Sequence, residues 1–243
     1  MPLLKYRTRF NPTVNGPLHI GHAYLCLINE FEAHNSGGEF SVRFEDNQPE
    51  WVWRFSRTET IRFMNEMIRD LTWLGIKVDH YYHQSKMEEQ LEKLWKAVAE
   101  DVWIDVACNT TFDSPPECTN SDFILFPYAP LLIAERVLYD NLTFTTLLIR
   151  GNDLQTTFCL YMYFCDIFGV ARPRHVYVPQ LSIAGEMGLL PAINKTSSNF
   201  QIKSFREAGM RPDELLYELR QACLIHPNGD WSLSNIKRQP KWG

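Results

Sequence analysis

The sequence predicts an α/β fold: a doubly wound parallel sheet with helices on both faces. Segments rich in β-branched and aromatic residues alternate with stretches of helical periodicity, which is the pattern of parallel strands joined by crossover helices. A loop of proline, asparagine and glycine joins the first such segment to a helix, where doubly wound sheets place their ligands. The chain has 243 residues and 45% hydrophobic content, so one substantial core is expected rather than two full domains.

The N-terminal half is predicted to contain two strands and three helices. The first strand covers about residues 4–10, and the helix after the loop runs from His19 to about Ala33. Residues 39–46, EFSVRFED, alternate between apolar and polar and predict a second strand that ends on carboxylates. Apolar residues at helical spacing predict an amphipathic helix over 57–74, closed by Gly75, and a further helix covers about 86–99.

The C-terminal half begins with a segment rich in turn residues. Residues 101–130 are predicted to form a short insertion that interrupts one domain. The segments LLIAERVLYD (131–140) and FTTLLIRG (144–151) are interpreted as strands, residues 153–167 as a mostly apolar helix, and HVYVPQL (175–181) as another strand. From about residue 201 the pattern is helical, with Pro212 at the first turn of the last clear helix.

Composition narrows the function classes. The formal net charge of −5 weighs against a protein whose whole surface grips nucleic acid, because Lys and Arg supply most of the affinity for phosphates. No apolar run is long enough to span a membrane and no signal-peptide segment opens the chain, so a cytoplasmic protein without a membrane partner is expected. Among the six cysteines only Cys108 and Cys118 are considered as a metal or disulfide pair, and no metal site is predicted.

The junction FNPTVNGPLHIGHAYL places His19 and His22 three residues apart at the start of a helix. Residues at this spacing share one helical face, so the pair could ligate a metal, contact a phosphate or lie exposed on a first turn. A helix that begins beyond a strand directs N–H groups at an anion, which favours phosphate. Gly21 would let the phosphate approach the backbone, and the imidazoles would donate to oxygens whose charge rises during a reaction.

The tetrapeptide HIGH (residues 19–22) resembles the signature of class I aminoacyl-tRNA synthetases. TRFNPTVNGPLHIGHA is similar to RFAPSPTGxLHIGHA of glutamyl-tRNA synthetases, GGEFSVRFEDNQPE to GGxFxLRIEDTD, and LLIRGNDL to HVIRGEDL. The likeness covers about residues 6–100 and 130–222. It implies one Rossmann-like catalytic domain over 1–243, with 101–130 as a reduced insertion in place of the acceptor-binding domain, 200–243 as the helical segment after the KxSKR-type loop, and no anticodon-binding domain.

The resemblance implies that His19 and His22 are catalytic together with Lys195. The second lysine of KxSKR falls on Lys195, whereas the first falls on Ala192, so half of the lysine pair is absent. One ammonium on such a loop can close over pyrophosphate during in-line displacement at the α-phosphate, with Mg²⁺ bound to the phosphates. The positions implied for ATP binding are Gly16, His19, Gly21, His22, Asp153, Leu181 and Lys195.

The resemblance also implies an amino-acid pocket. Arg9 aligns with the family arginine that clamps the substrate carboxylate, and Arg150 with the arginine that meets the side-chain carboxylate. Glu45 aligns with the acid that receives the α-amino group. Two arginines and one acid balance the charges of glutamate, which favours an acidic amino acid.

Three pocket positions depart from the family pattern. Thr13 replaces a serine and keeps a hydroxyl. The family tyrosine falls on Leu132 and the family asparagine on Arg136, so a hydroxyl is lost and a cation is gained. A site that loses a hydrogen-bonding group loses discrimination, so the substrate is expected to be glutamate, a modified glutamate or another diacid.

The function implied is that of an ATP-dependent ligase, which forms an aminoacyl-adenylate and transfers it to tRNA or another acceptor. Three alternatives stay open: a tRNA-independent ligase to a small amine or carrier, an HxGH nucleotidyltransferase, and a non-catalytic synthetase paralogue. The short glutamyl-queuosine tRNA(Asp) synthetases offer one model, although Cys108 and Cys118 do not reproduce their zinc spacing.

Overall fold

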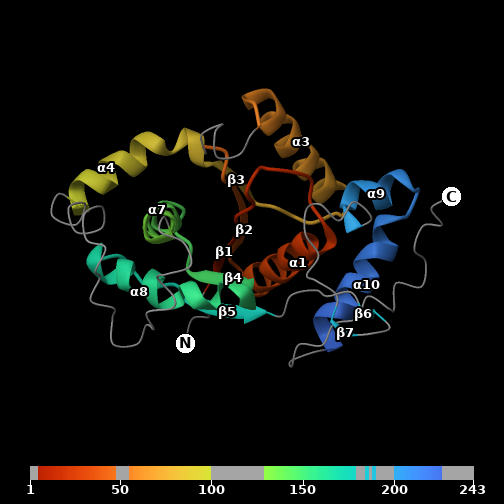
Figure 1. The fold of residues 1–243 in the computed structure, drawn as a ribbon. Coiled ribbons are helices and arrows are strands. Elements are labelled where there is room, and N and C mark those ends of the chain that lie inside the picture. The colour runs from red at the N-terminus through yellow and green to blue at the C-terminus, as the bar shows by residue number, and fades with distance from the viewer. Residues whose placement is uncertain are drawn as a thin grey trace.

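A five-stranded sheet lies at the centre of the computed structural model, which describes residues 5–47, 55–99, 129–178, 184–185, 188–189 and 200–225 (Figure 1). Its strand order is β3-β2-β1-β4-β5, and every neighbouring pair is parallel. The predicted parallel α/β sheet is confirmed. Its strands are β1 (Arg7–Phe10), β2 (Glu39–Phe44), β3 (His80–His83), β4 (Leu147–Gly151) and β5 (Arg174–Val178), and a separate antiparallel pair is β6 (Ala184–Gly185) with β7 (Gly188–Leu189).

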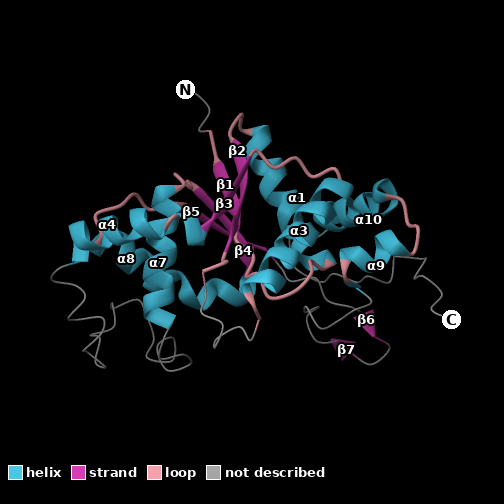
Figure 2. Cartoon of the chain, turned by 90° about the horizontal axis from the view of Figure 1, so that it is seen from above, coloured by secondary structure: helices cyan, strands magenta, loops and turns pink. Residues whose placement is uncertain are grey.

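Helices cover both faces of the central sheet, as Figures 1 and 2 show from two directions. One layer consists of α1 (Ile20–Asn35), α3 (Arg57–Trp73), α9 (Ile202–Glu207) and α10 (Pro212–Ile225). The other layer consists of α4 (Glu88–Ala99), α7 (Ala129–Leu142) and α8 (Phe158–Ile167). Within the described residues, none of the helices combines the length and apolar content needed to cross a bilayer.

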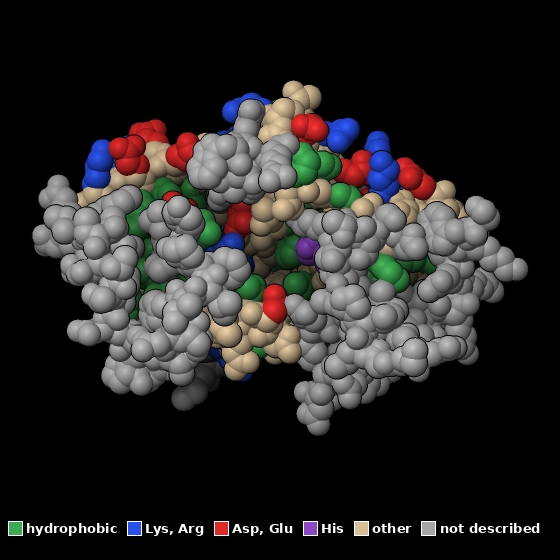
Figure 3. Space-filling view, in the orientation of Figure 1, with side chains coloured by type: hydrophobic (Ala, Val, Ile, Leu, Met, Phe, Trp, Pro, Cys, Tyr) green, Lys and Arg blue, Asp and Glu red, His purple; other side chains and the backbone are tan. Residues whose placement is uncertain are grey.

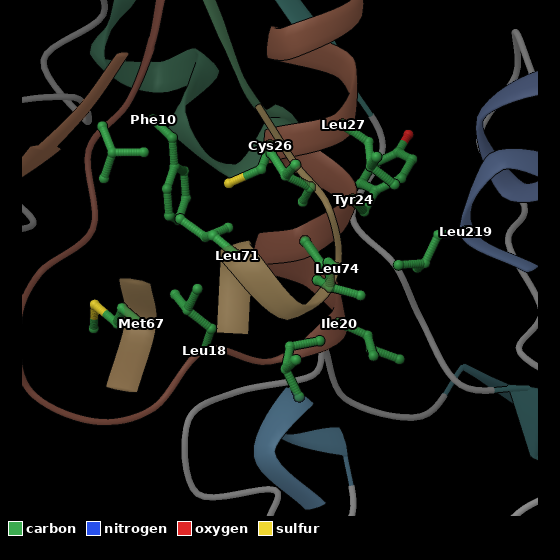
Figure 4. Close-up of a cluster of buried hydrophobic side chains, with 14 of the residues drawn as sticks. Phe10, Leu18, Ile20, Tyr24, Cys26, Leu27, Met67, Leu71, Leu74 and Leu219 are labelled. Carbon is green, nitrogen blue, oxygen red and sulfur yellow. The ribbon is translucent and has the colours of Figure 1, made fainter. Parts of the chain in front are cut away.

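Each helical layer has its own apolar core against the sheet. On the α1 side, Ile20 and Leu27 pack with Met67 and Leu71 of α3 and with Leu219 of α10 (Figure 4). On the other side, side chains of α4, α7 and α8 pack on Leu148 of β4. The sheet is therefore covered on both faces, as its all-parallel pairing requires.

Two predicted boundaries are confirmed by the backbone. Helix α3 ends before Gly75, whose φ of 69° lies in the left-handed region that glycine adopts at the end of a helix. Helix α10 begins at Pro212, where the missing N–H of proline costs no helical hydrogen bond. Residues 101–128, which make up most of the predicted insertion, and residues 179–181 lie outside the described residues.

The interpretation of residues 131–140 as a strand is wrong. This segment lies within helix α7, and its buried side chains recur at a spacing of four: Ile133 with Val137, and Ala134 with Leu138. Leu, Ile, Val and Tyr occur here in an apolar run, and such a run does not distinguish a buried helix from a strand by periodicity alone. The correction matters because a helix brings Asp140 to the face that packs on the sheet.

Two further differences concern the edges of the sheet. The aromatic segment HYYH forms β3, an edge strand paired with β2, which was not predicted. The helix predicted from Asp153 begins only at Phe158, because Asn152–Thr157 form a 3₁₀ helix after β4. The tighter turn keeps Asp153 exposed on the first turn beyond the strand.

Gly38, the residue before β2, lies tightly against the backbone of Tyr6. A Cβ atom at this position would lie 1.9 Å from the carbonyl oxygen of Tyr6. We expect Gly38→Ala to lower the free energy of unfolding by about 1–3 kcal/mol or more, because backbone must move. The control Gly169→Ala, which adds a Cβ in open space at a φ of 61°, should cost about 1 kcal/mol. Urea titration of both variants checks this, and equal losses would contradict it.

Candidate functional site

The candidate site lies between β1 and β4, where successive strands begin to be added on the other side of β1. The first crossover leaves β1 toward β2, whereas β4 pairs on the other side of β1, so the carboxyl ends of β1 and β4 flank a topological switch point. Ligands of doubly wound sheets bind at such a point. Figure 3 shows a hollow near the middle of one face, in which a histidine and both acidic and basic side chains are visible.

His19 and His22 meet at the N-terminus of α1. His19 is the extended residue that caps the helix, with φ −118° and ψ 169°, and the two rings stack with centroids 3.6 Å apart. The His19 backbone N–H donates to Nδ1 of His22 over 3.3 Å. In the neutral form His22 then carries its proton on Nε2, which makes Nε2 a donor at the helix end where anions bind.

Gly21 makes room for the stacked histidine pair. A Cβ atom here would lie 3.0 Å from both Cε1 and Nδ1 of His19, so a larger residue would displace that ring. This contact gives Gly21 a local role that the sequence analysis did not foresee. The expected approach of a phosphate to Gly21 and to the buried Gly16 stays a prediction.

The C-terminal helices return to the same place. Gln201 forms a β-bridge with His19, and the N–H of Ile202 donates to the carbonyl of Leu18 over 3.0 Å. Helix α9 is thereby anchored beside the start of α1. Ala192, Lys195 and Leu181 lie outside the described residues, so their predicted roles stay predictions.

A buried carboxylate, Asp140 of α7, joins two strands of the sheet. Arg9 of β1 donates to both its oxygens, over 2.7 and 3.0 Å, and Arg43 of β2 donates over 2.8 Å. The hydroxyl of Tyr161 donates over 2.8 Å. Burial alone would raise the pKa of Asp140, but Arg9 and Arg43 hold it well below its ordinary value. The guanidinium of Arg9, predicted to clamp a substrate, is thus already bound to a carboxylate of the chain.

Arg150, at the end of β4, has unused hydrogen-bonding capacity. Its Nη1 reaches Thr157 Oγ1 over 3.4 Å, and its guanidinium lies 4.9 Å from the ring centre of Tyr161. Its buried Nε and Nη2 have no hydrogen-bond partner in the part of the chain that the structure describes. Burial, and then the charge of Arg9, lower the pKa of Arg150 to about 10. The residue stays a cation at neutral pH, and none of the described carboxylates forms an ion pair with it.

His175 and Tyr177 of β5 stand beside Arg150. Tyr177 is the register partner of Arg150, and within the described residues its hydroxyl has no hydrogen-bond partner. His175 Nδ1 lies 3.1 Å from the carbonyl of Pro173, so Nδ1 carries the proton and Nε2 is an acceptor. Burial, followed by the charge of Arg150, lowers the pKa of His175 to about 4. The imidazole is therefore neutral at pH 7.

Glu45, just beyond β2, forms a closed set of contacts. Its Oε1 accepts from Asn11 over 2.5 Å and from Nε and Nη2 of Arg136 over 3.2 and 3.1 Å, while its Oε2 accepts from Thr13 over 2.6 Å. Burial favours a raised pKa, but Arg136 and the Thr13 hydroxyl lower the pKa of Glu45 below its ordinary value. The structure brings together Glu45, Thr13 and Arg136, and it leaves Leu132 exposed on α7.

Several residues of the site were missed in the sequence analysis. The signal for Arg43 was a charged residue on the alternating face of an apolar strand, and the signal for Asp140 was an acid within an apolar run. The residues missed are Asn11, Arg43, Asp140, Tyr161, His175 and Tyr177. Among the described residues, no group of three His, Cys, Asp or Glu side chains could hold a metal ion, and Cys108 and Cys118 lie outside them.

The chain resembles known proteins over part of its length. Residues 5–104 match the family described as tRNA synthetases class I (E and Q), catalytic domain. The chain is 34% identical over 104 residues to the cytoplasmic glutamate–tRNA ligase of Arabidopsis thaliana, which is 40% of this chain and 14% of that protein. It is 41% identical over 83 residues to the glutamate–tRNA ligase of Aquifex aeolicus, which is 34% of this chain and 16% of that protein.

Solved structures share the fold over more of the chain. The glutamate–tRNA synthetase of Elizabethkingia anophelis has a TM-score of 0.63 at 15% identity, covering 89% of this chain and 61% of that one. The tyrosyl-tRNA synthetase of Archaeoglobus fulgidus has a TM-score of 0.53 at 15% identity, over 74% of this chain and 56% of that one. The Rossmann-like class I synthetase fold and the sequence resemblance to glutamyl-tRNA synthetases are confirmed.

Proposed function

We propose, from the match of residues 5–104 to the catalytic domain of class I synthetases for glutamate and glutamine, that the chain activates a carboxylic acid with ATP. The acid is glutamate or a related diacid. An oxygen of its carboxylate attacks the α-phosphorus, the bond to pyrophosphate breaks, and an acyl-adenylate forms. An acceptor then attacks the acyl carbon and AMP leaves. We propose tRNA as the acceptor, with a small amine or carrier as the alternative.

The junction of β1 and α1 supports this proposal most strongly. Helix α1 begins at the switch point of the sheet. Buried His19 caps this helix, and the neighbouring His22 has Nε2 as a hydrogen-bond donor. Such donors stabilise the charge that builds on phosphate oxygens in the transition state. Lys195 precedes Gln201 by six positions, and Gln201 bridges to His19, so we propose that its ammonium neutralises the leaving pyrophosphate. Mg²⁺ would enter bound to the phosphates of ATP.

Arg150 is the proposed contact for the substrate carboxylate. Two of its buried N–H groups lack partners among the described residues, and a guanidinium fork matches the two oxygens of a carboxylate. Arg9 is a poorer probe of binding, because its substitution would also leave Asp140 with fewer partners.

The test is ATP–pyrophosphate exchange with a panel of carboxylic acids, with and without tRNA. We expect exchange with a five-carbon diacid, and Arg150→Gln should raise KM for the acid about 10–100-fold, because hydrogen bonds to charged groups contribute about 1.5–3 kcal/mol. The control Arg174→Gln alters an exposed arginine of β5 that contacts Tyr6 and should leave KM unchanged.

Each alternative function has its own outcome in this experiment. No exchange with any carboxylate, with or without RNA, would contradict the proposal. Nucleotide binding without exchange would favour a non-catalytic paralogue, and transfer of a nucleotide to a phosphate metabolite would favour a nucleotidyltransferase. Exchange that needs no RNA would favour a ligase for a small amine or carrier.

A further inference from the structure

The two buried carboxylates of the site are already neutralised by the chain's own arginines. Glu45 is 6% exposed and receives Arg136, Asn11 and Thr13 on its two oxygens. Asp140 is 2% exposed and receives Arg9, Arg43 and Tyr161. Neither acid is left to bind a further cation.

Cations outnumber acids among the side chains around Asp140 and Glu45. We name these side chains the arginine cluster. Its four guanidinium groups face two carboxylates, which leaves an excess of two positive charges among the described residues. Glu135 is also near Glu45, and burial raises its pKa; even when ionised it leaves one positive charge in excess. The arginine cluster consists of Arg9, Arg43, Arg136 and Arg150 with Asp140 and Glu45.

Some N–H groups of the arginine cluster have no hydrogen-bond acceptor among the described residues. Nη2 of Arg43 and both Nε and Nη2 of Arg150 are buried and have no hydrogen-bond partner within the described ranges. Strand alternation and register place Arg43, Arg9, Arg150 and Tyr177 on the same face of the sheet. A buried donor is costly unless an acceptor reaches it, and a cation is the most costly. The acceptors that fit are oxygens of an anion.

We propose that the arginine cluster selects a dicarboxylate that lacks an ammonium group over the zwitterionic amino acid. This inference rests on the proposed function, since it names the carboxylic acid that the site would take. The two carboxylates of such a ligand bring negative charge to a cluster whose described groups carry one positive charge in excess when Glu135 is ionised and two when it is neutral. An ammonium group would have to displace Arg136 from Glu45 or lie unpaired near four guanidinium groups, and like charges at close range disfavour binding.

Arg136 is the specificity determinant in this account. Its side chain is 32% exposed and comes from α7, whereas Glu45 follows β2, so the contact depends on one side chain of the helix. Removing its charge would leave the Glu45 carboxylate, among the residues that the structure describes, with two neutral hydrogen-bond donors, Asn11 and Thr13. A carboxylate in that state becomes a receptor for an ammonium group.

The direct test is calorimetric binding of glutarate and of L-glutamate to the intact chain without nucleotide. The two ligands share five carbons and two carboxylates, and they differ by the ammonium group. We expect glutarate to bind at least about tenfold more tightly. Equal affinities, tighter binding of L-glutamate, or no binding of either ligand at millimolar concentration would overturn the proposal.

A variant then tests the role of Arg136. Arg136→Gln should reverse the preference by improving L-glutamate affinity about tenfold and weakening glutarate. The control Arg172→Gln removes an arginine from the exposed pair with Asp166 and should leave both affinities unchanged. An unchanged preference in Arg136→Gln would overturn the assignment to Arg136, and if that variant does not fold, the comparison in the unmodified chain decides alone.

The outcome is separable from the proposed function. Binding of glutarate over L-glutamate without any ATP–pyrophosphate exchange would uphold the selectivity of the cluster and reject the ligase. Exchange that proceeds best with L-glutamate would uphold the ligase and reject the selectivity.

Discussion

Asp140→Asn is expected to lower the free energy of unfolding by about 3–5 kcal/mol, because it leaves two buried arginines without a counterion. Asp140 is the acid that neutralises both Arg9 and Arg43, and all three side chains are less than a tenth exposed. Asparagine keeps the shape but removes the charge. Urea titration with a two-state fit measures the difference.

The matched control is Asp166→Asn, which breaks an exposed pair with Arg172. Both of those side chains are 54% exposed, so the loss should stay below about 1 kcal/mol. A loss for Asp140→Asn no larger than that of the control would show that the cluster does not hold the fold together.

The difference in free energy of unfolding between the unmodified chain and Asp140→Asn should also depend on pH. Burial raises the pKa of Asp140, but Arg9 and Arg43 overcome this, so the folded-state pKa lies below the unfolded value of about 3.9. A lowered carboxyl pKa contributes stability that is present above the unfolded value and is lost as pH falls toward the folded value. The gap between the unmodified chain and Asp140→Asn should therefore narrow below about pH 4.

His22→Asn is expected to lower kcat for exchange about 10²–10³-fold, the loss typical of removing one donor to a developing oxyanion. Its amide oxygen can replace Nδ1 as the acceptor for the His19 N–H, but nothing replaces the Nε2 donor. His22→Gln, whose amide nitrogen extends farther, should lose less. KM for the carboxylic acid should change little in either variant.

The control for this pair is His34→Gln at the far end of α1, where the imidazole contacts Asp79. Its exchange rate should equal that of the unmodified chain. Equal losses for His22→Asn and His22→Gln would indicate that the position matters for packing against His19 rather than for donation to phosphate.

The fold was predictable where local signals and tertiary packing agree. A short β-rich segment, a loop of Pro, Asn and Gly, and a following helix predicted β1 and α1, and the alternation of EFSVRFED predicted β2. Helix α7 was interpreted as a strand, because its run of Leu, Ile, Val and Tyr also fits a buried strand and the i, i+4 spacing is short. Edge strand β3 was missed because its four residues, HYYH, show no alternation of apolar and polar side chains.

The sequence indicated some candidate residues of the site, but it showed neither their pairings nor the buried partners Arg43 and Asp140. Alignment identified Arg9, Glu45 and Arg150 by position, yet position does not show which charges the chain satisfies internally. Arg9 binds Asp140, and Glu45 binds Arg136, which became visible only when α7 was placed on the sheet. The sequence favoured glutamate because Glu45 would bind its ammonium group. In the structure Arg136 already binds Glu45, so the charges of the site disfavour an ammonium group.

The central claim is that one site holds a triphosphate at the start of α1 and a carboxylate at Arg150. The most direct measurement is a crystal structure with a non-hydrolysable ATP analogue and the acid that gives the strongest exchange. We predict phosphate oxygens within hydrogen-bond distance of His19 or His22 and the carboxylate on Nε and Nη2 of Arg150. A nucleotide bound elsewhere, or an acid that leaves Arg150 without an acceptor, would contradict it.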